Sequence, residues 1–385
     1  MSITLLISHN KGQRRVFYLK DGQVLDVDLE LSASKSPEFA YLDRIYWGQV
    51  IHAKPSHSFV KLSKNQVGLL PLEHPFPKPI EGQTVLVQIR REAIPDKGTH
   101  HKGPILTQKI IFGGRYCLFH PFQKKRLISS KLRDPSTRNR LQSIISADEP
   151  ITLRESASRA SEEEIHAEIA ALNKKFSDLT ALSNKAPCAT PYDALPSSQR
   201  WMRDLDALEE NKILVDHDEA LTDVRHFLKS HRPDLIPHVK KYKGSLLKEF
   251  DLEDFWDSLF EDRVELLKGG NIVIEATTAC IIIDVNQGES SSNDHKETNE
   301  EAIPVIVQQL KARHLGGNII IDFMGDERSP QDRINLKDIL LTQAAIYNLP
   351  LDVFGWSKLG WMEARLPKRR LPVKDILNLD KSLGA

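Results

Sequence analysis

Residues 269–286 read GGNIVIEATTACIIIDVN, and residues 318–322 read NIIID. The first stretch holds two apolar runs on either side of Thr-Thr, which predicts a hairpin whose second strand ends at Asp284. The second stretch predicts another buried strand, which ends at Asp322. If the two strands are neighbours in one sheet, both carboxylates emerge at the same edge of that sheet.

The segment between these strands predicts a helix with an apolar stripe. We expect a capping box at Thr298 and Glu301, and a helix that continues through His314 before Gly316-Gly317 ends it. Pro304 is expected in the first turn, because a proline further inside would kink the helix.

Asp284, Asn286 and Asp322 form the candidate catalytic group. Mg²⁺ prefers oxygen ligands, usually one or two carboxylates completed by water and substrate phosphate. Asn286 projects to the same side as Asp284 if the strand continues, so its amide could hold a carboxylate or a phosphate. Aspartate also ends strands by bonding to the following turn, and the residues alone leave both interpretations open. Other carboxylates in polar segments are expected to be solvated: Asp294, Asp326, Glu327 and Asp332.

Length and composition limit the class of protein. The 385 residues exceed what one core organises, and 40% hydrophobic with 28% charged residues is typical of a globular chain. No apolar run approaches the roughly 20 residues that span a bilayer, so no membrane association is expected. The N-terminus, MSITLLISHNKGQRR, lacks the pattern of a signal peptide, which favours a cytoplasmic location.

The three cysteines, Cys117, Cys188 and Cys280, are far apart and contain no CxxC pair. This spacing argues against a disulfide framework and against a structural zinc site built from this chain alone.

Charge is balanced overall but unevenly distributed. Residues 81–140 hold 13 Lys or Arg and 4 Asp or Glu, a balance of +9, whereas residues 141–220 have a balance of −8. A basic segment fits a phosphate-binding surface, and an uneven solvated surface is the alternative.

The first 200 residues predict strands at first, then a helix and a loop. ITLLI and RVFYLK predict two strands, and the β pattern that starts at residue 44 predicts a small barrel. Residues 161–176 predict a helix with a capping box at Ser161 and Glu164. Residues 182–199, rich in Pro and Ser, predict a linker or surface loop.

The run GGNIVIEATTACIIIDVNQG, the later TNEEAIPVIVQQLKARHLGGNIIIDF, and SKLGWMEARLPKRR resemble the catalytic core of the ribonuclease E/G family. IYWGQVIHAKPSHSFVKLSKNQVGLLPL is similar to the S1-type OB-fold of that family. The resemblance implies an α+β multidomain chain with an RNase H-like unit at 1–37 and 195–258, an OB-fold at 38–113, a reduced 5′-sensor region at 114–194 and a DNase I-like catalytic subdomain at 259–385.

The resemblance also implies a reaction and its residues. Asp284 and Asp322 match the two aspartates that bind the catalytic Mg²⁺, with Mn²⁺ as a substitute, and Asn286 matches the catalytic asparagine of Asp-x-Asn. The implied activity is endonucleolytic hydrolysis of single-stranded RNA by metal-activated water, leaving a 5′-phosphate and a 3′-hydroxyl, in RNA processing or decay.

Three further residues match RNA-binding positions of the family. Phe59 matches a base-stacking aromatic, for which a barrel-core position is the alternative, and Lys102 matches a lysine beside the RNA path. Arg154 matches an arginine of the 5′-monophosphate pocket, but Glu155 replaces the threonine that follows it in the family. A glutamate would repel a terminal phosphate, so we expect no 5′-end sensing of the usual kind. A salt bridge to the Glu-rich helix at 161–176 is the alternative role for Arg154.

The C-terminal stretch LPVKDILNLDKSLGA lacks the Cys-Pro-x-Cys motif of larger family members. A zinc-linked tetramer is therefore not expected, and a homodimer stays open. Two other functions compete with the ribonuclease: a catalytically weak OB-fold RNA-binding protein, and a metal-dependent nuclease acting on DNA, which only the metal pair supports.

Overall fold

In the computed structural model, the chain is described at residues 2–10, 13–30, 41–74, 76–93, 102–124, 126–182, 188–288, 295–325 and 329–383. Its described part forms two compact units. The first holds the described residues up to 30 and those from Asp206 onward, and the second holds those from 41 to Leu205. The expected mixed architecture with several sheets and one small barrel is confirmed.

The first sheet of the first unit has the strand order β15-β14-β1-β2-β3. β1 pairs with β14 in parallel and with β2 antiparallel. The strands are β1 (Ile3–Asn10), β2 (Gln13–Lys20), β3 (Gln23–Glu30), β14 (Lys212–Val215) and β15 (Val239–Lys241). The two expected N-terminal strands are thus confirmed, and β3 is a third that the sequence reading did not identify. The helices of this region are α4 (Asp218–His231), α5 (Leu246–Glu249) and α6 (Glu253–Ser258), with the 3₁₀ segment Pro233–His238.

The second sheet of this unit has the order β16-β17-β18-β19-β21-β20. β17 and β18 form the expected antiparallel hairpin, and β18 and β19 are parallel neighbours, joined by the helical connection between them. The strands are β16 (Arg263–Glu265), β17 (Asn271–Ala276), β18 (Cys280–Asn286), β19 (Gly317–Asp322), β20 (Asp352–Trp356) and β21 (Met362–Leu366).

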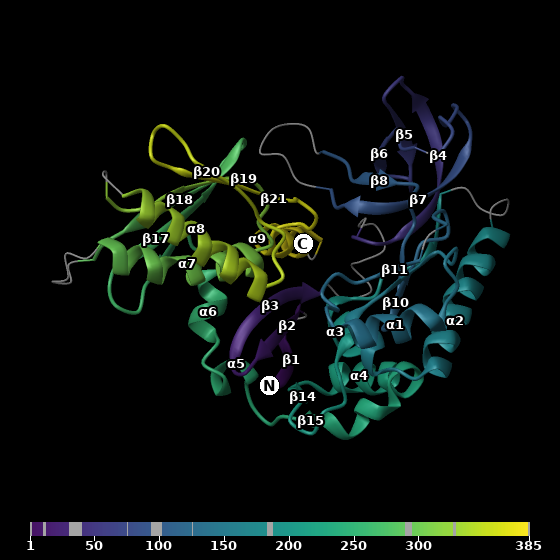
Figure 1. Cartoon of the computed structure of the whole chain (residues 1–385), viewed down its shortest axis with the longest axis horizontal. Helices are drawn as coiled ribbons and strands as arrows, with labels where there is room; N and C mark the ends of the chain where they lie inside the picture. Colours follow the sequence, from purple (N-terminus) through teal and green to yellow (C-terminus); the bar gives the residue numbers. More distant parts are fainter. Residues whose placement is uncertain are drawn as a thin grey trace. The chain divides into compact units, whose positions relative to one another are not determined.

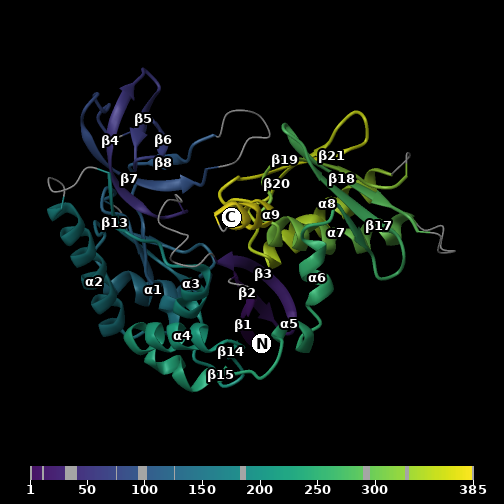
Figure 2. The same cartoon turned by 180° about the vertical axis from the view of Figure 1, so that it is seen from behind.

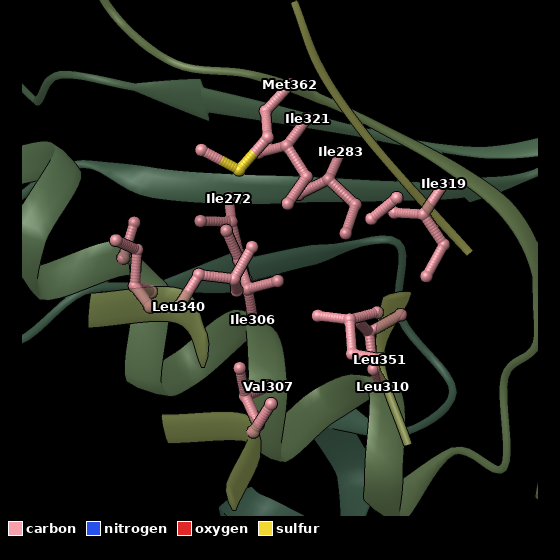
Figure 3. Packing of buried hydrophobic residues seen from close by; sticks show 14 of the residues in the cluster. Ile272, Ile283, Ile306, Val307, Leu310, Ile319, Ile321, Leu340, Leu351 and Met362 are labelled. Atoms are coloured by element: carbon pink, nitrogen blue, oxygen red, sulfur yellow. The ribbon is translucent and has the colours of Figure 1, made fainter. Parts of the chain in front are cut away.

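One face of this sheet packs against α7 (His295–Ala312) and α8 (Pro330–Ile346), as Figures 1 and 2 show. Figure 3 shows Ile272, Ile283 and Ile321 of the sheet packed toward Ile306 and Leu340 of the two helices. Because side chains alternate along a strand, burial of Ile281, Ile283 and Val285 turns the residues between them to the opposite, uncovered face.

The start of α7 corrects two expectations. Helix α7 already includes His295, so Thr298 lies inside it and is buried rather than capping it. The carboxylate of Glu301 accepts a hydrogen bond from the backbone N–H of Lys268 at 2.9 Å instead of closing a capping box. Pro304 therefore lies in the helix interior and not in the first turn, and it removes the hydrogen bond to the carbonyl four residues earlier.

The helix also ends earlier than expected, at Ala312. His314 adopts a left-handed conformation with φ 56°, and the N–H of Leu315 bonds back to the carbonyl of Leu310 at 3.0 Å. The His314 ring lies between the carbonyls of Val27 and Leu371, which joins the end of α7 to β3. Arg370 forms a salt bridge with Asp28 of the same strand. The final helix is α9 (Val373–Leu383).

The second unit contains a closed barrel with the order β4-β5-β6-β8-β7, which β4–β7 pairing completes (Figures 1 and 2). Its strands are β4 (Ile45–Ala53), β5 (His57–Lys61), β6 (Val67–Pro71), β7 (Thr84–Arg91) and β8 (Ile105–Thr107). Tyr46, Val60 and Leu70 belong to the buried interior. The expected small barrel is confirmed and has the closed five-stranded form of an OB-fold.

Beside the barrel lies a four-stranded sheet covered by helices. The capping box at Ser161 and Glu164 is confirmed, and its helix continues to Ala181. The expected linker at 182–199 is partly structured: β13 pairs with β4, α3 begins at Ser197, and residues 183–187 lie outside the described part. The elements are β9 (Phe112–Gly113), β10 (Cys117–Phe119), β11 (Leu127–Ile128), α1 (Pro135–Ile144), β12 (Ile151–Leu153), the 3₁₀ segment Glu155–Arg159, α2 (Glu162–Ala181), β13 (Ala189–Tyr192) and α3 (Ser197–Asp204).

Within the described residues, no helix is both long enough and apolar enough to cross a membrane.

Candidate functional site

Asp284 and Asp322 are register partners at the carboxyl ends of the parallel strands β18 and β19. Adjacent strands lie about 4.8 Å apart, so the two carboxylates project side by side from one edge of the sheet. Both lie on the face that α7 and α8 leave uncovered, with Asp284 exposed and Asp322 half-buried. Neither forms a salt bridge with any described residue, so a cation at this edge would relieve their mutual repulsion.

Asn286 lies two residues beyond Asp284 on the same face. Its Nδ2 donates a hydrogen bond to Oδ2 of Asp284 at 2.9 Å. The Asn286 amide therefore holds the carboxylate of Asp284. The sequence had left open whether it would hold a carboxylate or a phosphate. This contact fixes the rotation of the Asp284 side chain and leaves Oδ1 without a partner among the described residues.

Trp361 performs the same role for the second aspartate. Its indole Nε1–H donates to Oδ2 of Asp322 at 3.1 Å. The sequence does not mark this residue as part of the site, although it lies in the motif SKLGWMEARLPKRR. Only the antiparallel register of β19 and β21, which pairs Ile321 with Met362, reveals that Trp361 faces Asp322.

The backbone at this edge is held by close contacts. Gly270 has φ +96°, and a Cβ there would lie 2.5 Å from the carbonyl oxygen of Asn286. Only glycine meets both conditions, which explains why the residue directly before β17 is Gly270. On the other strand, the buried Asn299 of α7 pairs with the backbone of Met324, donating to its carbonyl at 3.0 Å and accepting from its N–H at 2.9 Å. The chain beyond Asp322 is therefore fixed as well.

The donors at this edge suit a hard, oxygen-seeking cation. Two carboxylates, each with one oxygen left over, match the one or two carboxylates that Mg²⁺ takes alongside its waters. Zinc is usually held by three or four protein ligands, and no group of three His, Cys, Asp or Glu with that capacity occurs among the described residues. Asp294, Asp326 and Glu327 lie outside the described part, and Asp332 accepts a hydrogen bond from Ser329.

Phe59 lies on the outer side of the barrel. Along β5 its neighbours Ser58 and Val60 are buried, whereas Phe59 is half-buried. The ammonium of Lys54 lies 5.6 Å from the centre of its ring, and the ring of His57 contacts it edge-on at 5.3 Å. Phe59 therefore does not belong to the barrel core and presents an aromatic surface beside a positive charge. Tyr46, by contrast, is core, and the indole of Trp47 bonds to the carbonyl of Leu179.

Lys102 is exposed just before β8, and Leu69 pairs with Phe59 across β5 and β6. The side chain of Leu69 thus lies next to Phe59, and it adds no aromatic ring to the stacking surface. Phe59 and Lys102 belong to the second unit, whereas Asp284 and Asp322 belong to the first.

Arg154 forms a bidentate salt bridge with Asp204, with both N–O distances at 2.8 Å. Arg203 binds the same carboxylate from Nε and Nη2, at 2.8 and 3.0 Å. Burial alone would raise the pKa of Asp204, but hydrogen bonds and charge from Arg203 and Arg154 outweigh it and lower that pKa. The partner of Arg154 is therefore Asp204 of α3 rather than the Glu-rich helix α2, and Arg154 also donates to the carbonyl of Gly114 at 2.6 Å.

The basic segment 81–140 is less available to phosphates than its charge suggests. Arg126 donates to the carbonyls of Gln142 and Ile145, both at 2.7 Å, at the end of α1. Arg138 and Arg140 likewise donate to backbone carbonyls. These guanidinium groups stabilise turns and helix ends, so part of the charge excess is structural.

Comparison with known proteins covers most of the chain. Residues 112–368 match the Ribonuclease E/G family. Ribonuclease G of Escherichia coli (strain K12) is 24% identical over 411 residues, which is 98% of this chain and 82% of the relative. Ribonuclease G of Haemophilus influenzae is 27% identical over 309 residues, 77% of this chain and 62% of the relative. Ribonuclease E of Nostoc sp. is 31% identical over 271 residues, 66% of this chain and 38% of the relative. Because the family match spans well over half of the sequence, the chain belongs to the ribonuclease E/G family.

Proposed function

We propose that this chain is a metal-dependent endoribonuclease that cleaves single-stranded RNA, with Asp284 and Asp322 holding one Mg²⁺. The observation that carries the proposal is the register pairing of the two aspartates on adjacent parallel strands, in a member of this family. Asp284 is exposed and Asp322 is half-buried on the sheet face opposite α7 and α8, so an RNA phosphate could approach them there. Mn²⁺ would serve as a substitute of similar ligand preference.

Each residue at the edge has a defined task. Asp284 and Asp322 would each offer Oδ1 to the cation. Bound there, the cation would stabilise charge on the scissile phosphate and lower the pKa of the attacking water, which yields a 5′-phosphate and a 3′-hydroxyl. Asn286 uses one amide N–H to hold Asp284 and has a second N–H for a phosphate oxygen.

The barrel would bind the RNA. The half-buried ring of Phe59 can stack on a base, and Lys54 and Lys102 supply positive charge for the backbone. Stacking tolerates any base, which suits an enzyme for unstructured RNA. From the family we also propose an RNase H-like unit at 1–37 and 195–258, and a DNase I-like catalytic subdomain at 259–385.

Arg154 is the weakest of the candidate RNA ligands. Asp204 balances the charge of Arg154. To bind Arg154, a terminal phosphate would have to displace the Asp204 carboxylate, which both Arg154 and Arg203 hold. We therefore propose that cleavage does not depend on a 5′-monophosphate. Substrates that differ only in a 5′-monophosphate or 5′-hydroxyl should be cleaved at similar rates, and much faster cleavage of the monophosphate would contradict this point.

Cleavage of an unstructured oligoribonucleotide tests the main proposal. Asp284→Asn should lose Mg²⁺-dependent cleavage while RNA affinity is retained, because the barrel is unaffected. Asp352→Asn is the control, since it neutralises an exposed carboxylate on β20 of the same sheet. If the wild-type chain bound RNA but cleaved none with Mg²⁺ or Mn²⁺, the alternative of an OB-fold RNA-binding protein would replace the enzyme.

A further inference from the structure

Trp361 lies directly across the sheet from Asp322. The pairing of Ile321 with Met362 continues by one residue in an antiparallel register, which places Trp361 opposite Asp322. Asp322 in turn pairs with Asp284. The three side chains therefore form one row across β18, β19 and the start of β21, with the indole N–H bonded to Oδ2 of Asp322 at 3.1 Å.

The turn that carries Trp361 is fixed from both sides. Ser357 donates its backbone N–H to the carbonyl of Trp361 at 2.8 Å, and the Ser357 hydroxyl accepts the N–H of Trp361 at 3.2 Å. Trp356, at the end of β20, donates its indole N–H to the carbonyl of Arg333 at 3.1 Å and packs near Phe323. Phe323 directly follows Asp322. The hairpin therefore contacts the end of β19 at two consecutive residues, through Trp361 at Asp322 and through Trp356 at Phe323.

The chemistry of the donor suits a cation site. An indole N–H donates and never accepts, so it cannot exchange roles with the carboxylate. It is also neutral, and it leaves the negative charge of the aspartate pair intact for a cation, which a lysine or arginine would cancel. The hydrogen bond to Oδ2 fixes the carboxylate of Asp322 and leaves Oδ1 without a partner among the described residues, and Mg²⁺ demands near-ideal geometry from each ligand.

We propose that Trp361 is a positioning residue that orients Asp322 for the cation, as Asn286 orients Asp284. The inference rests on the proposed metal role of the two aspartates. Trp361 itself contacts neither the cation nor the reacting water. Partners that orient metal ligands typically contribute about 10–100-fold to metal affinity, and this is the effect expected here.

Direct measurement of Mn²⁺ binding to the full chain tests the proposal. Trp361→Phe keeps an aromatic ring but removes the N–H, so the Mn²⁺ dissociation constant should rise about 10–100-fold. In cleavage assays the metal concentration for half-maximal rate should rise by the same factor. The rate at saturating metal and the KM for RNA should stay close to wild type, a split that a general loss of structure would not produce.

Trp356→Phe is the matched control, because it removes the other indole hydrogen bond of the same hairpin and keeps an aromatic ring next to Phe323. It should leave Mn²⁺ affinity unchanged. If Trp361→Phe fails to fold, β-(3-benzothienyl)alanine at position 361 removes only the N–H and should show the same loss. Wild-type affinity in the variant lacking the N–H, or an equal loss in Trp356→Phe, would overturn the proposal. Absence of Mn²⁺ binding in the wild-type chain would instead overturn the proposed function on which it rests.

Discussion

Asp284 and Asp322 are paired in register on two parallel strands, and each has its Oδ2 held by a neutral N–H donor. Two like charges are thereby kept side by side with one oxygen each unused. Such a pair is unfavourable without a cation, since neither carboxylate has an ionic partner among the described residues.

Removal of the amide from Asn286 tests the first of the two donors. Asn286→Ala should lower the cleavage rate about 10–100-fold, because Asp284 loses the bond that fixes its rotation. The unfolding temperature should change little, since Asn286 is only half-buried at a strand end. Asn318→Ala is the matched control, an exposed asparagine at the other end of β19. Equal activity of the two variants would contradict the assigned role.

Gly270 should be required for activity and not only for stability. Gly270→Ala places a Cβ 2.5 Å from the carbonyl of Asn286 and strains a residue with φ +96°, at a cost of about 1–3 kcal/mol. Movement of Asn286 should then reduce cleavage at a temperature where the variant is folded. Gly22→Ala is the control, because Gly22 has φ +83° with nothing within 4 Å of the added carbon. It should lose stability without loss of cleavage, and an active Gly270→Ala enzyme would refute the argument.

Phe59 should contribute to RNA binding rather than to barrel stability. Phe59→Ala should weaken RNA binding by about 1–3 kcal/mol, the value of one base stacked on an aromatic ring. The free energy of unfolding should be nearly unchanged, since the ring lies outside the buried interior of the barrel. Val67→Ala removes another exposed apolar side chain of the barrel and should leave RNA affinity as it is. A large loss of stability in Phe59→Ala would indicate a packing role.

Asp204 should stabilise the second unit in a pH-dependent way. Arg203 and Arg154 lower its pKa below the ordinary 3.8 in spite of burial, so its contribution is fully present above about pH 4 and is lost as pH falls through the lowered value. Asp204→Asn should therefore be less stable than wild type at pH 7, by about 1–3 kcal/mol. The difference in unfolding free energy should shrink as pH falls below 4. A difference independent of pH would show that the carboxylate charge is not responsible.

The two strands that end at the aspartates of the second sheet could be predicted, because the apolar pattern that marks each strand lies within a few consecutive residues. Apolar runs that end in Asp284 and Asp322, with a helical pattern between them, predict two strands and a helical connection, and side-chain alternation then sets which residues share a face. The sequence left open whether the two strands are neighbours, and the parallel pairing in the structure shows that they are. Asn286 followed from the same alternation. The barrel was predicted for a similar reason, since its strands alternate and are separated by turn residues.

Other features depend on distant parts of the chain and could not be predicted. Trp361 reaches Asp322 only through the register of a third strand, and Asp204 lies 50 residues from Arg154. β3 reads QVLDVDLE, and its charged residues interrupt the apolar pattern that would predict a strand. One of them, Asp28, is paired with the distant Arg370. In α7, the rule that places proline in the first turn was overridden by packing of the apolar stripe against the sheet.

A crystal of the full chain soaked in Mn²⁺ tests the central claim most directly, because anomalous scattering locates the ion. We predict one ion between Asp284 and Asp322, with one oxygen of each carboxylate at about 2.1 Å, the distance typical of a small divalent cation bound by oxygen. An ion found elsewhere, or carboxylate oxygens too far apart to share one ion, would contradict the account.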